Sequence, residues 1–208
     1  FDHKYNMSNL ILDILDKTKL QRLRLSSIDC VEVDENFNEV LKDQRVMPHL
    51  HLSIQSGDDM ILKRMKRRHN SKDVFQFVDR CKKIRKDISF GADIIAGFPT
   101  ETDTMFENTY KLLRENEISH LHIFPFSPKN NTPASRMPQV SKSIIKKRAK
   151  ILRDLGELIL KKVKSKLSLP REVLIEELNS GLAIGYDQNY IKHKVPLVGV
   201  PVGEVIRV

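Results

Sequence analysis

The chain has 208 residues, of which 40% are hydrophobic and 30% charged, with only 8 glycines and 9 prolines. This composition excludes a disordered or collagen-like chain, and the length is enough for one good core with a small appended module. Lysine and arginine together number 36 against 27 acidic residues, a formal net charge of +9. Such an excess favours a polyanionic partner such as nucleic acid, although a solvated basic surface explains the charge equally well.

Sequence signals for export or membrane insertion are absent. No apolar run reaches the length of a membrane span, and no signal peptide is visible. We therefore expect a cytoplasmic protein that has no membrane partner.

Helix-like and strand-like patterns alternate from residue 9 to residue 126. We expect helices over 9–20, 37–44, 58–65, 73–86 and 104–117, and strands over 22–28, 49–55, 88–98 and 120–126. The strand over 88–98 is apolar almost throughout, which is typical of a strand buried on both faces. Repeats of this length predict βα units around a parallel sheet, either open or closed into a barrel.

The pattern changes near Pro128. Residues 127–140 are rich in Pro and Asn and predict a loop, and a long helix with an apolar stripe and many basic residues is expected over 143–167. Short β segments are then expected over 172–177, 182–187, 190–195 and 203–208. They predict a small antiparallel barrel, and because the chain ends within the last strand we expect this barrel to be incomplete.

The two cysteines, Cys30 and Cys81, are too few and too far apart for a disulfide framework or a C-x-x-C metal motif. Cys81 shares a helical face with Val74 and Val78, which favours a buried apolar role. Cys30 follows a predicted strand and has no His or Cys near it in the sequence. We therefore expect no ligand role for Cys30.

Small polar and turn-forming residues end several of the predicted strands. In a parallel βα architecture, ligands bind at the carboxyl ends of the strands. Gln55 and Ser56 at one such end can hydrogen-bond a ribose, while Gly57 lets backbone approach closely. Each corner alone is more often an ordinary turn, but four corners on one rim favour a binding site.

Histidines and a basic cluster are the other candidates. His49 with His51, and His120 with His122, each place two imidazoles on one face of a strand, which is compatible with a metal. Packing on the sheet is the favoured interpretation, so we predict no metal site. The basic cluster over 63–69 is either a solvated face or a site for carboxylate and phosphate groups.

Four longer motifs carry a family resemblance. RLRLSSID, MPHLHLSIQSGDDMILKRMKRRH, FGADIIAGFPTETDTMFENT and LHIFPFSPKNNTPASRMPQV together resemble the tRNA methylthiotransferases of the radical S-adenosylmethionine superfamily. Among them, the branch acting on threonylcarbamoyladenosine is the most similar. The resemblance implies a transferase that methylthiolates carbon 2 of N6-threonylcarbamoyladenosine next to the tRNA anticodon, using S-adenosylmethionine and 4Fe-4S clusters.

The resemblance also implies a division of the chain into three parts. Residues 1–140 would form the C-terminal part of a partial (βα) parallel barrel, and residues 141–169 a long basic connecting helix. Residues 170–208 resemble the TRAM module, an OB-like RNA-binding β-barrel, and would be a truncated copy of it.

Site residues follow from the same resemblance. The implied cofactor-binding residues are Gln55, Ser56, Arg67, Ile95 and Gly97. Arg67 would meet the methionine carboxylate of the cofactor. The implied substrate-region residues are Ser127 and Arg136, and the implied RNA-binding residues are Lys63, Lys66, Arg68, Lys192 and Lys194.

The chain departs from the family pattern in one respect. The cluster motif C-x-x-x-C-x-x-C is absent, and two cysteines cannot supply its three thiolates. We therefore expect a C-terminal portion that has no catalytic residue, binds no cluster, is inactive alone and has weakened or lost affinity for S-adenosylmethionine. Two alternatives remain open: a non-catalytic tRNA-binding remnant, and a complementing subunit that pairs with a separate N-terminal half.

Overall fold

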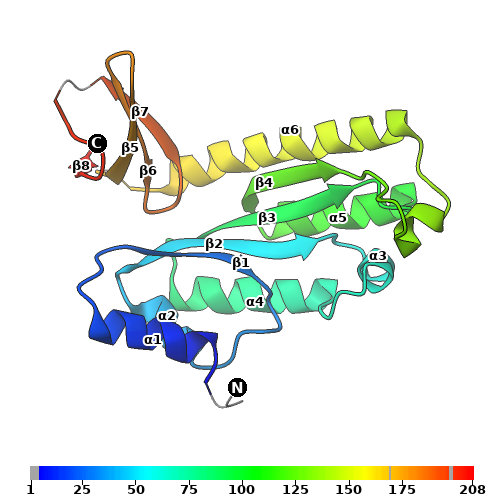
Figure 1. The fold of residues 1–208 in the computed structure, drawn as a ribbon, viewed down its shortest axis with the longest axis horizontal. Helices are drawn as coiled ribbons and strands as arrows, with labels where there is room; N and C mark the ends of the chain where they lie inside the picture. Colours follow the sequence, from blue (N-terminus) through cyan, green and yellow to red (C-terminus); the bar gives the residue numbers. More distant parts are fainter. Residues whose placement is uncertain (1–4, 169, 197–198) are drawn as a thin grey trace.

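A parallel sheet flanked by helices forms most of the molecule. The computed structural model describes residues 5–168, 170–196 and 199–208. The sheet has the strand order β1-β2-β3-β4, with all neighbours parallel. Its strands are β1 (Leu23–Ile28), β2 (Val46–Gln55), β3 (Ser89–Ala96) and β4 (Ile118–Pro125). The helices are α1 (Met7–Lys17), α2 (Phe37–Lys42), α3 (Asp59–Arg64), α4 (Ser71–Ile84), α5 (Asp103–Glu115), the short 3-10 helix η1 (Pro133–Arg136) and α6 (Lys142–Lys166). The predicted βα architecture is confirmed (Figure 1).

The helices cover one face of this sheet. Leu50 and Leu52 of β2, with Phe90 of β3, are at most 1% exposed and belong to the main hydrophobic core. Full burial of each such side chain contributes about 1.5 to 3 kcal/mol. Cys81 of α4 is fully buried in this core, as predicted.

Helix α6 belongs to the same layer. Ala149, Leu152 and Leu155 lie in the main core, and the helix runs alongside β4 (Figure 1). Helix α6 therefore packs against the parallel sheet, as the other helices of this layer do, and also connects it to the second sheet. No helix among the described residues is long and apolar enough to cross a membrane.

The opposite face of the sheet is polar. Residues that alternate with the core positions point there, including His51 of β2 and Asp93 of β3. Asp93 and Ile95 are half-buried, so the expectation that β3 is buried on both faces is wrong at these positions. A carboxylate needs hydrogen-bond partners or water, which an apolar layer cannot supply.

A second, antiparallel sheet follows α6. It has the order β7-β6-β5-β8, from β5 (Glu172–Asn179), β6 (Leu182–Asp187), β7 (Lys192–Pro196) and β8 (Val205–Arg207). The β5–β6 hairpin turns at Ser180 and Gly181, whose φ angles of 48° and 80° suit the tight turn that right-twisted strands require. Val173, Ile175 and Ala183 form its small core.

The turn between β6 and β7 docks on the amino end of the parallel sheet. Asn189 is 1% exposed, and its side-chain amide donates to the carbonyl of Pro48 at 2.9 Å and to that of Asp87 at 2.7 Å. The carbonyl of Tyr190 lies 3.1 Å from His120 Nε2. The second sheet therefore lies at the end opposite α3, and the carboxyl ends of β1 to β4 are left uncovered by it (Figure 1).

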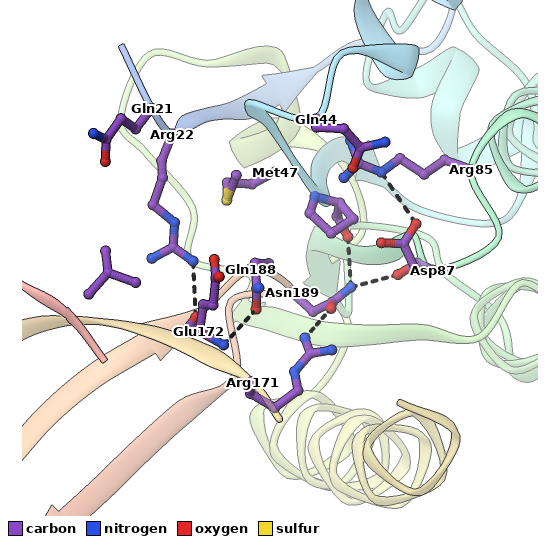
Figure 2. Close-up of a pocket in the computed structure, with 12 residues that line it drawn as sticks. Gln21, Arg22, Gln44, Met47, Arg85, Asp87, Arg171, Glu172, Gln188 and Asn189 are labelled. Carbon is purple, nitrogen blue, oxygen red and sulfur yellow. Dashed lines mark hydrogen bonds and ion pairs between the residues drawn. The ribbon is translucent and has the colours of Figure 1, made fainter. Parts of the chain in front are cut away.

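A cavity of about 480 Å³ lies at the joint, by which we mean the contact between the second sheet and the amino end of the parallel sheet (Figure 2). Its cationic side chains are already committed to protein acceptors. Arg22 donates to the carbonyl of Glu172 at 3.0 Å, and Arg171 pairs with Asp187 at 3.0 Å. Because the Arg22 bond joins the start of β1 to β5 at the amino ends of the parallel strands, the cavity belongs to the contact between the two sheets and lies away from the rim where ligands are expected.

Truncation of Arg148 should strongly destabilise the protein. This α6 side chain is buried and donates to the carboxylates of Glu101 and Asp103, both at 2.7 Å. Arg148→Ala leaves the buried Glu101 carboxylate without its partner, so the free energy of unfolding should fall by about 3 to 5 kcal/mol in urea denaturation. The exposed neighbour Lys147 provides a control, since Lys147→Ala should change the free energy of unfolding by less than about 0.5 kcal/mol. Equal effects of the two substitutions would contradict this account of α6.

The joint should weaken in acid. Burial lowers the pKa of His120 to about 4, whereas an unfolded chain has a histidine pKa of about 6.5. The neutral imidazole therefore stabilises the fold fully above pH 6.5, and this contribution is lost as the pH falls from about 6.5 to 4.

The measurement is the free energy of unfolding of wild type and His120→Gln across this pH range. The difference between the two proteins should shrink by about 1 to 3 kcal/mol from pH 7 to pH 4. A difference that is independent of pH would show that His120 does not titrate in this way.

Candidate ligand-binding site

A cavity of about 440 Å³ opens at the carboxyl ends of the parallel strands. It is lined by Gln55, Arg64, Met65, Lys66, Arg67, Ile95, Phe98, Thr132, Pro133 and Ala134. These residues come from the ends of β2 and β3, from the segment after α3, and from the start of η1. The volume falls within the usual range for a small-molecule site.

Gln55 and Arg67 place polar groups at this cavity. Gln55 ends β2 with a φ of 68°, a left-handed conformation that is uncommon for a residue with a side chain. Arg67 Nη2 donates to the carbonyl of Ser53 at 2.8 Å and to its hydroxyl at 2.6 Å. Arg67 Nε is buried and has no hydrogen-bond partner among the described residues. The guanidinium is thus fixed in position through Nη2, while Nη1, which is not buried and makes no hydrogen bond among the described residues, can donate to an anionic ligand group.

Apolar side chains form another part of the lining. Ile95 of β3 and Phe98 just after it line the cavity, and the Phe98 ring packs edge-to-face against Phe126 with centroids 5.3 Å apart. A flat heteroaromatic ring can lie against such a surface. Of the five residues predicted to bind a cofactor, the structure brings Gln55, Arg67 and Ile95 together here.

Ser56 and Gly97 lie outside the cavity lining. Ser56 is 1% exposed, and its hydroxyl lies 3.3 Å from that of Thr109 on α5. A Cβ on Gly97, whose φ is 74°, would collide with Ile145 of α6. Both residues hold helices against the rim, and their predicted contacts with a cofactor stay predictions.

Gly57 also serves packing. A Cβ at this position would lie 2.6 Å from Thr109 Cα, so the close backbone approach inferred from the sequence is made to helix α5. A site argument from the Gln-Ser-Gly corner therefore depends on Gln55 alone.

The two predicted substrate-region residues lie at the same end of the sheet. Ser127 follows β4, and Arg136 ends η1, the helix that contributes Pro133 and Ala134 to the cavity. Both are exposed. Their contact with a substrate stays a prediction.

One histidine of each H-x-H pair lies against a carboxylate, that of Asp93, which the sequence analysis did not connect to them. His51 Nε2 lies 3.0 Å and His122 Nδ1 lies 3.3 Å from the same oxygen of Asp93. Their ligand atoms lie within 4.8 Å of one another. His51 is hydrogen-bonded to Asp93, and His122 lies close to the same oxygen while exposed to solvent, so hydrogen bonds and solvent account for the group. Side chains two residues apart on a strand share a face, and adjacent parallel strands placed Asp93 between the two histidines.

The predicted RNA-binding residues fall into two groups. Lys63, Lys66 and Arg68 are exposed near the cavity, where Arg68 forms an ion pair with Glu32. By contrast, Lys192 and Lys194 are exposed on β7, an edge strand of the second sheet. Since α3 and β7 lie at opposite ends of the molecule, the two groups do not form one patch (Figure 1).

Comparison with known proteins gives consistent matches. Residues 9–113 match the family described as the Radical SAM superfamily. The chain is 51% identical over 183 residues to the threonylcarbamoyladenosine tRNA methylthiotransferase MtaB of Rickettsia prowazekii (strain Madrid E), covering 85% of this chain and 42% of that protein. It is 35% identical over 201 residues to the tRNA-2-methylthio-N(6)-dimethylallyladenosine synthase of Geobacillus kaustophilus (strain HTA426), covering 93% of this chain and 38% of that protein. The chain thus spans less than half the length of these relatives.

A solved structure is similar in fold. The Escherichia coli coproporphyrinogen III oxidase HemN, described as a radical SAM enzyme, superimposes with a TM-score of 0.56 at 17% sequence identity. The match covers 72% of this chain and 37% of that one. At this identity the likeness concerns the fold alone, and the superfamily assignment rests on the family match over residues 9–113.

Proposed function

The chain belongs to the Radical SAM superfamily, and from this premise we propose that it carries the cofactor-binding rim and a tRNA-binding surface of a tRNA methylthiotransferase. The proposed substrate is threonylcarbamoyladenosine beside the tRNA anticodon. The relatives named for that activity support this choice. The observation that carries the binding site is the carboxyl-end cavity with a fixed arginine and an apolar wall.

S-adenosylmethionine has groups that suit the cavity lining. Arg67 would hold its carboxylate through Nη1, and Gln55 would hydrogen-bond its ribose hydroxyls. Ile95 and Phe98 would pack against its adenine. When bound, S-adenosylmethionine supplies the activated methyl group for a methylthio product, and the role of these residues is to orient it and shield it from water.

The side chains of this chain do not fit a 4Fe-4S cluster. Such clusters are held by at least three thiolates, whereas the chain has only two cysteines, and one of them, Cys81, is buried in the main hydrophobic core. We therefore derive no reaction step through a cluster. This mismatch favours a second candidate, in which the chain alone binds cofactor or tRNA and a separate N-terminal half supplies the cluster. The position of β1 at a sheet edge supports such pairing, since an edge strand presents unpaired backbone groups.

A surface for tRNA is supported by charge. The chain has a formal net charge of +9, and Lys192 and Lys194 project from the exposed edge of the second sheet. Neutralising phosphates with lysine releases counterions, which drives sequence-independent binding. The rim lysines Lys63 and Lys66 would then meet the nucleotide segment that approaches the cofactor.

Removal of the Arg67 guanidinium should weaken cofactor binding. Arg67→Ala should lower the affinity for S-adenosylmethionine about tenfold to a hundredfold, because a charge-assisted hydrogen bond to the carboxylate is lost. Isothermal titration calorimetry measures this directly. The exposed Arg68 is the matched control, and Arg68→Ala should leave the affinity unchanged. Wild-type protein that binds no S-adenosylmethionine, or an Arg67→Ala variant that binds it equally well, would remove the proposed site.

Charge reversal on β7 should weaken tRNA binding. Replacing Lys192 and Lys194 together by Glu should lower the affinity for unmodified tRNA and reduce the slope of log K against log salt by roughly two, since each lost phosphate contact removes about one counterion. Lys72 and Lys83 on α4 are exposed and give a control with the same change in charge. If both double variants lose affinity equally, binding depends on net charge and not on β7.

A further inference from the structure

Asp29, Cys30 and His69 meet at the carboxyl rim. Asp29 and Cys30 follow β1, while His69 follows α3. Their oxygen, sulfur and nitrogen ligand atoms lie within 4.8 Å of one another, and Asp29 Oδ1 is 3.5 Å from His69 Nδ1. No sequence pattern pairs Cys30 with a histidine, because only the fold brings His69 next to it.

His69 carries an unpaired buried nitrogen. The residue is 3% exposed, and its Nε2 lies 3.1 Å from the carbonyl oxygen of Ile54. A carbonyl only accepts, so this bond places the ring proton on Nε2 and leaves a lone pair on Nδ1. Nδ1 is buried and has no hydrogen-bond partner among the described residues. It faces the carboxylate of Asp29, which is also an acceptor, and two buried acceptors face each other favourably only when a proton donor or a metal ion lies between them.

This group differs from the one formed by His51, Asp93 and His122. There both imidazoles point a nitrogen at the carboxylate with hydrogen-bond geometry or close to it, and neither is left as a buried orphan. The orphan nitrogen therefore singles out the group at Asp29, Cys30 and His69.

We propose that Asp29, Cys30 and His69 bind one zinc-class divalent ion through a carboxylate oxygen, Sγ and Nδ1. Zinc binds these three ligand types at about 2.0 to 2.3 Å in tetrahedral geometry, which separates neighbouring ligand atoms by roughly 3.2 to 3.7 Å. The 3.5 Å between Asp29 and His69 matches this spacing. A thiolate with an imidazole selects zinc over magnesium or calcium.

The surroundings of the group support the assignment. The bond from His69 Nε2 to the Ile54 carbonyl orients the ring, as an outer hydrogen bond does for most metal-binding histidines. The fourth coordination position is left to water or another ligand. As the ion binds, the Sγ–metal bond forms while the S–H bond of Cys30 breaks, and the proton leaves to solvent. Each bound ion therefore releases one proton from the thiol.

The site would tie two rim segments together. The ion pair of Arg68 with Glu32 already joins the segment after β1 to the segment after α3. The ion would join the same two segments through Asp29 and Cys30 on one side and His69 on the other. This structural role does not depend on the proposed cofactor or tRNA.

Cobalt(II) titration of the metal-stripped full chain, with a phosphine reductant, tests the site. We expect one ion per chain, with sulfur-to-cobalt charge-transfer absorption in the near ultraviolet and d–d bands in the visible that zinc abolishes. Cys30→Ser should lose the charge-transfer band, and His69→Gln should bind at least about tenfold more weakly. Cys81→Ser, at a buried cysteine of the core, is the matched control and should keep the band.

Other outcomes would overturn the proposal. Cobalt absorption without a charge-transfer band, lost in His122→Gln and retained in Cys30→Ser, would place the ion on the other group. Absence of cobalt binding by folded wild-type protein would show that Asp29, Cys30 and His69 hold no ion. Proton release measured in weakly buffered solution gives an independent readout, and an ion bound without release of the Cys30 proton would contradict thiolate ligation.

Discussion

The one-sided apolar packing of the parallel sheet governs the rest of the structure. Helices cover the face that carries Leu50, Leu52 and Phe90, and the other face carries Asp93 with imidazoles on either side. A sheet face with a carboxylate at its centre cannot be packed by an apolar layer without an unpaired polar group. The polar face and the carboxyl rim are therefore where this fold can receive ligands. The amino end is closed by Asn189 and its turn, which fixes the second sheet at a distance from the rim.

Much of the fold could be predicted because the sequence patterns are local. Helical periodicity and strand alternation predicted all the α-helices and strands, with differences only at their ends, whereas η1 lies in a segment predicted as a loop; β2, for example, begins at Val46 rather than His49. Capping explains one such end, since Asn70 and Asp73 form a reciprocal capping box at the start of α4. The half-buried state of Asp93 and Ile95 was missed, because an apolar run does not reveal whether a second layer covers it.

The site was harder to predict because it depends on contacts between distant residues. Gln55, Arg67 and Ile95 come together as expected, since carboxyl ends of parallel strands meet at one edge. Ser56 and Gly57 have the residue types of a ligand corner, yet α5 packs against them, and only the position of Thr109 reveals it. Likewise, nothing near Cys30 in the sequence indicates His69.

The central claim is that the carboxyl-end cavity is the cofactor site. Hydrogen–deuterium exchange of the full chain with and without S-adenosylmethionine tests it most directly, because amide protection reports which segments a ligand orders. The account predicts increased protection at the end of β2, over 64–68 and at the start of η1, with no change at the turn around Asn189. Protection confined to that turn, or no protection anywhere, would contradict it.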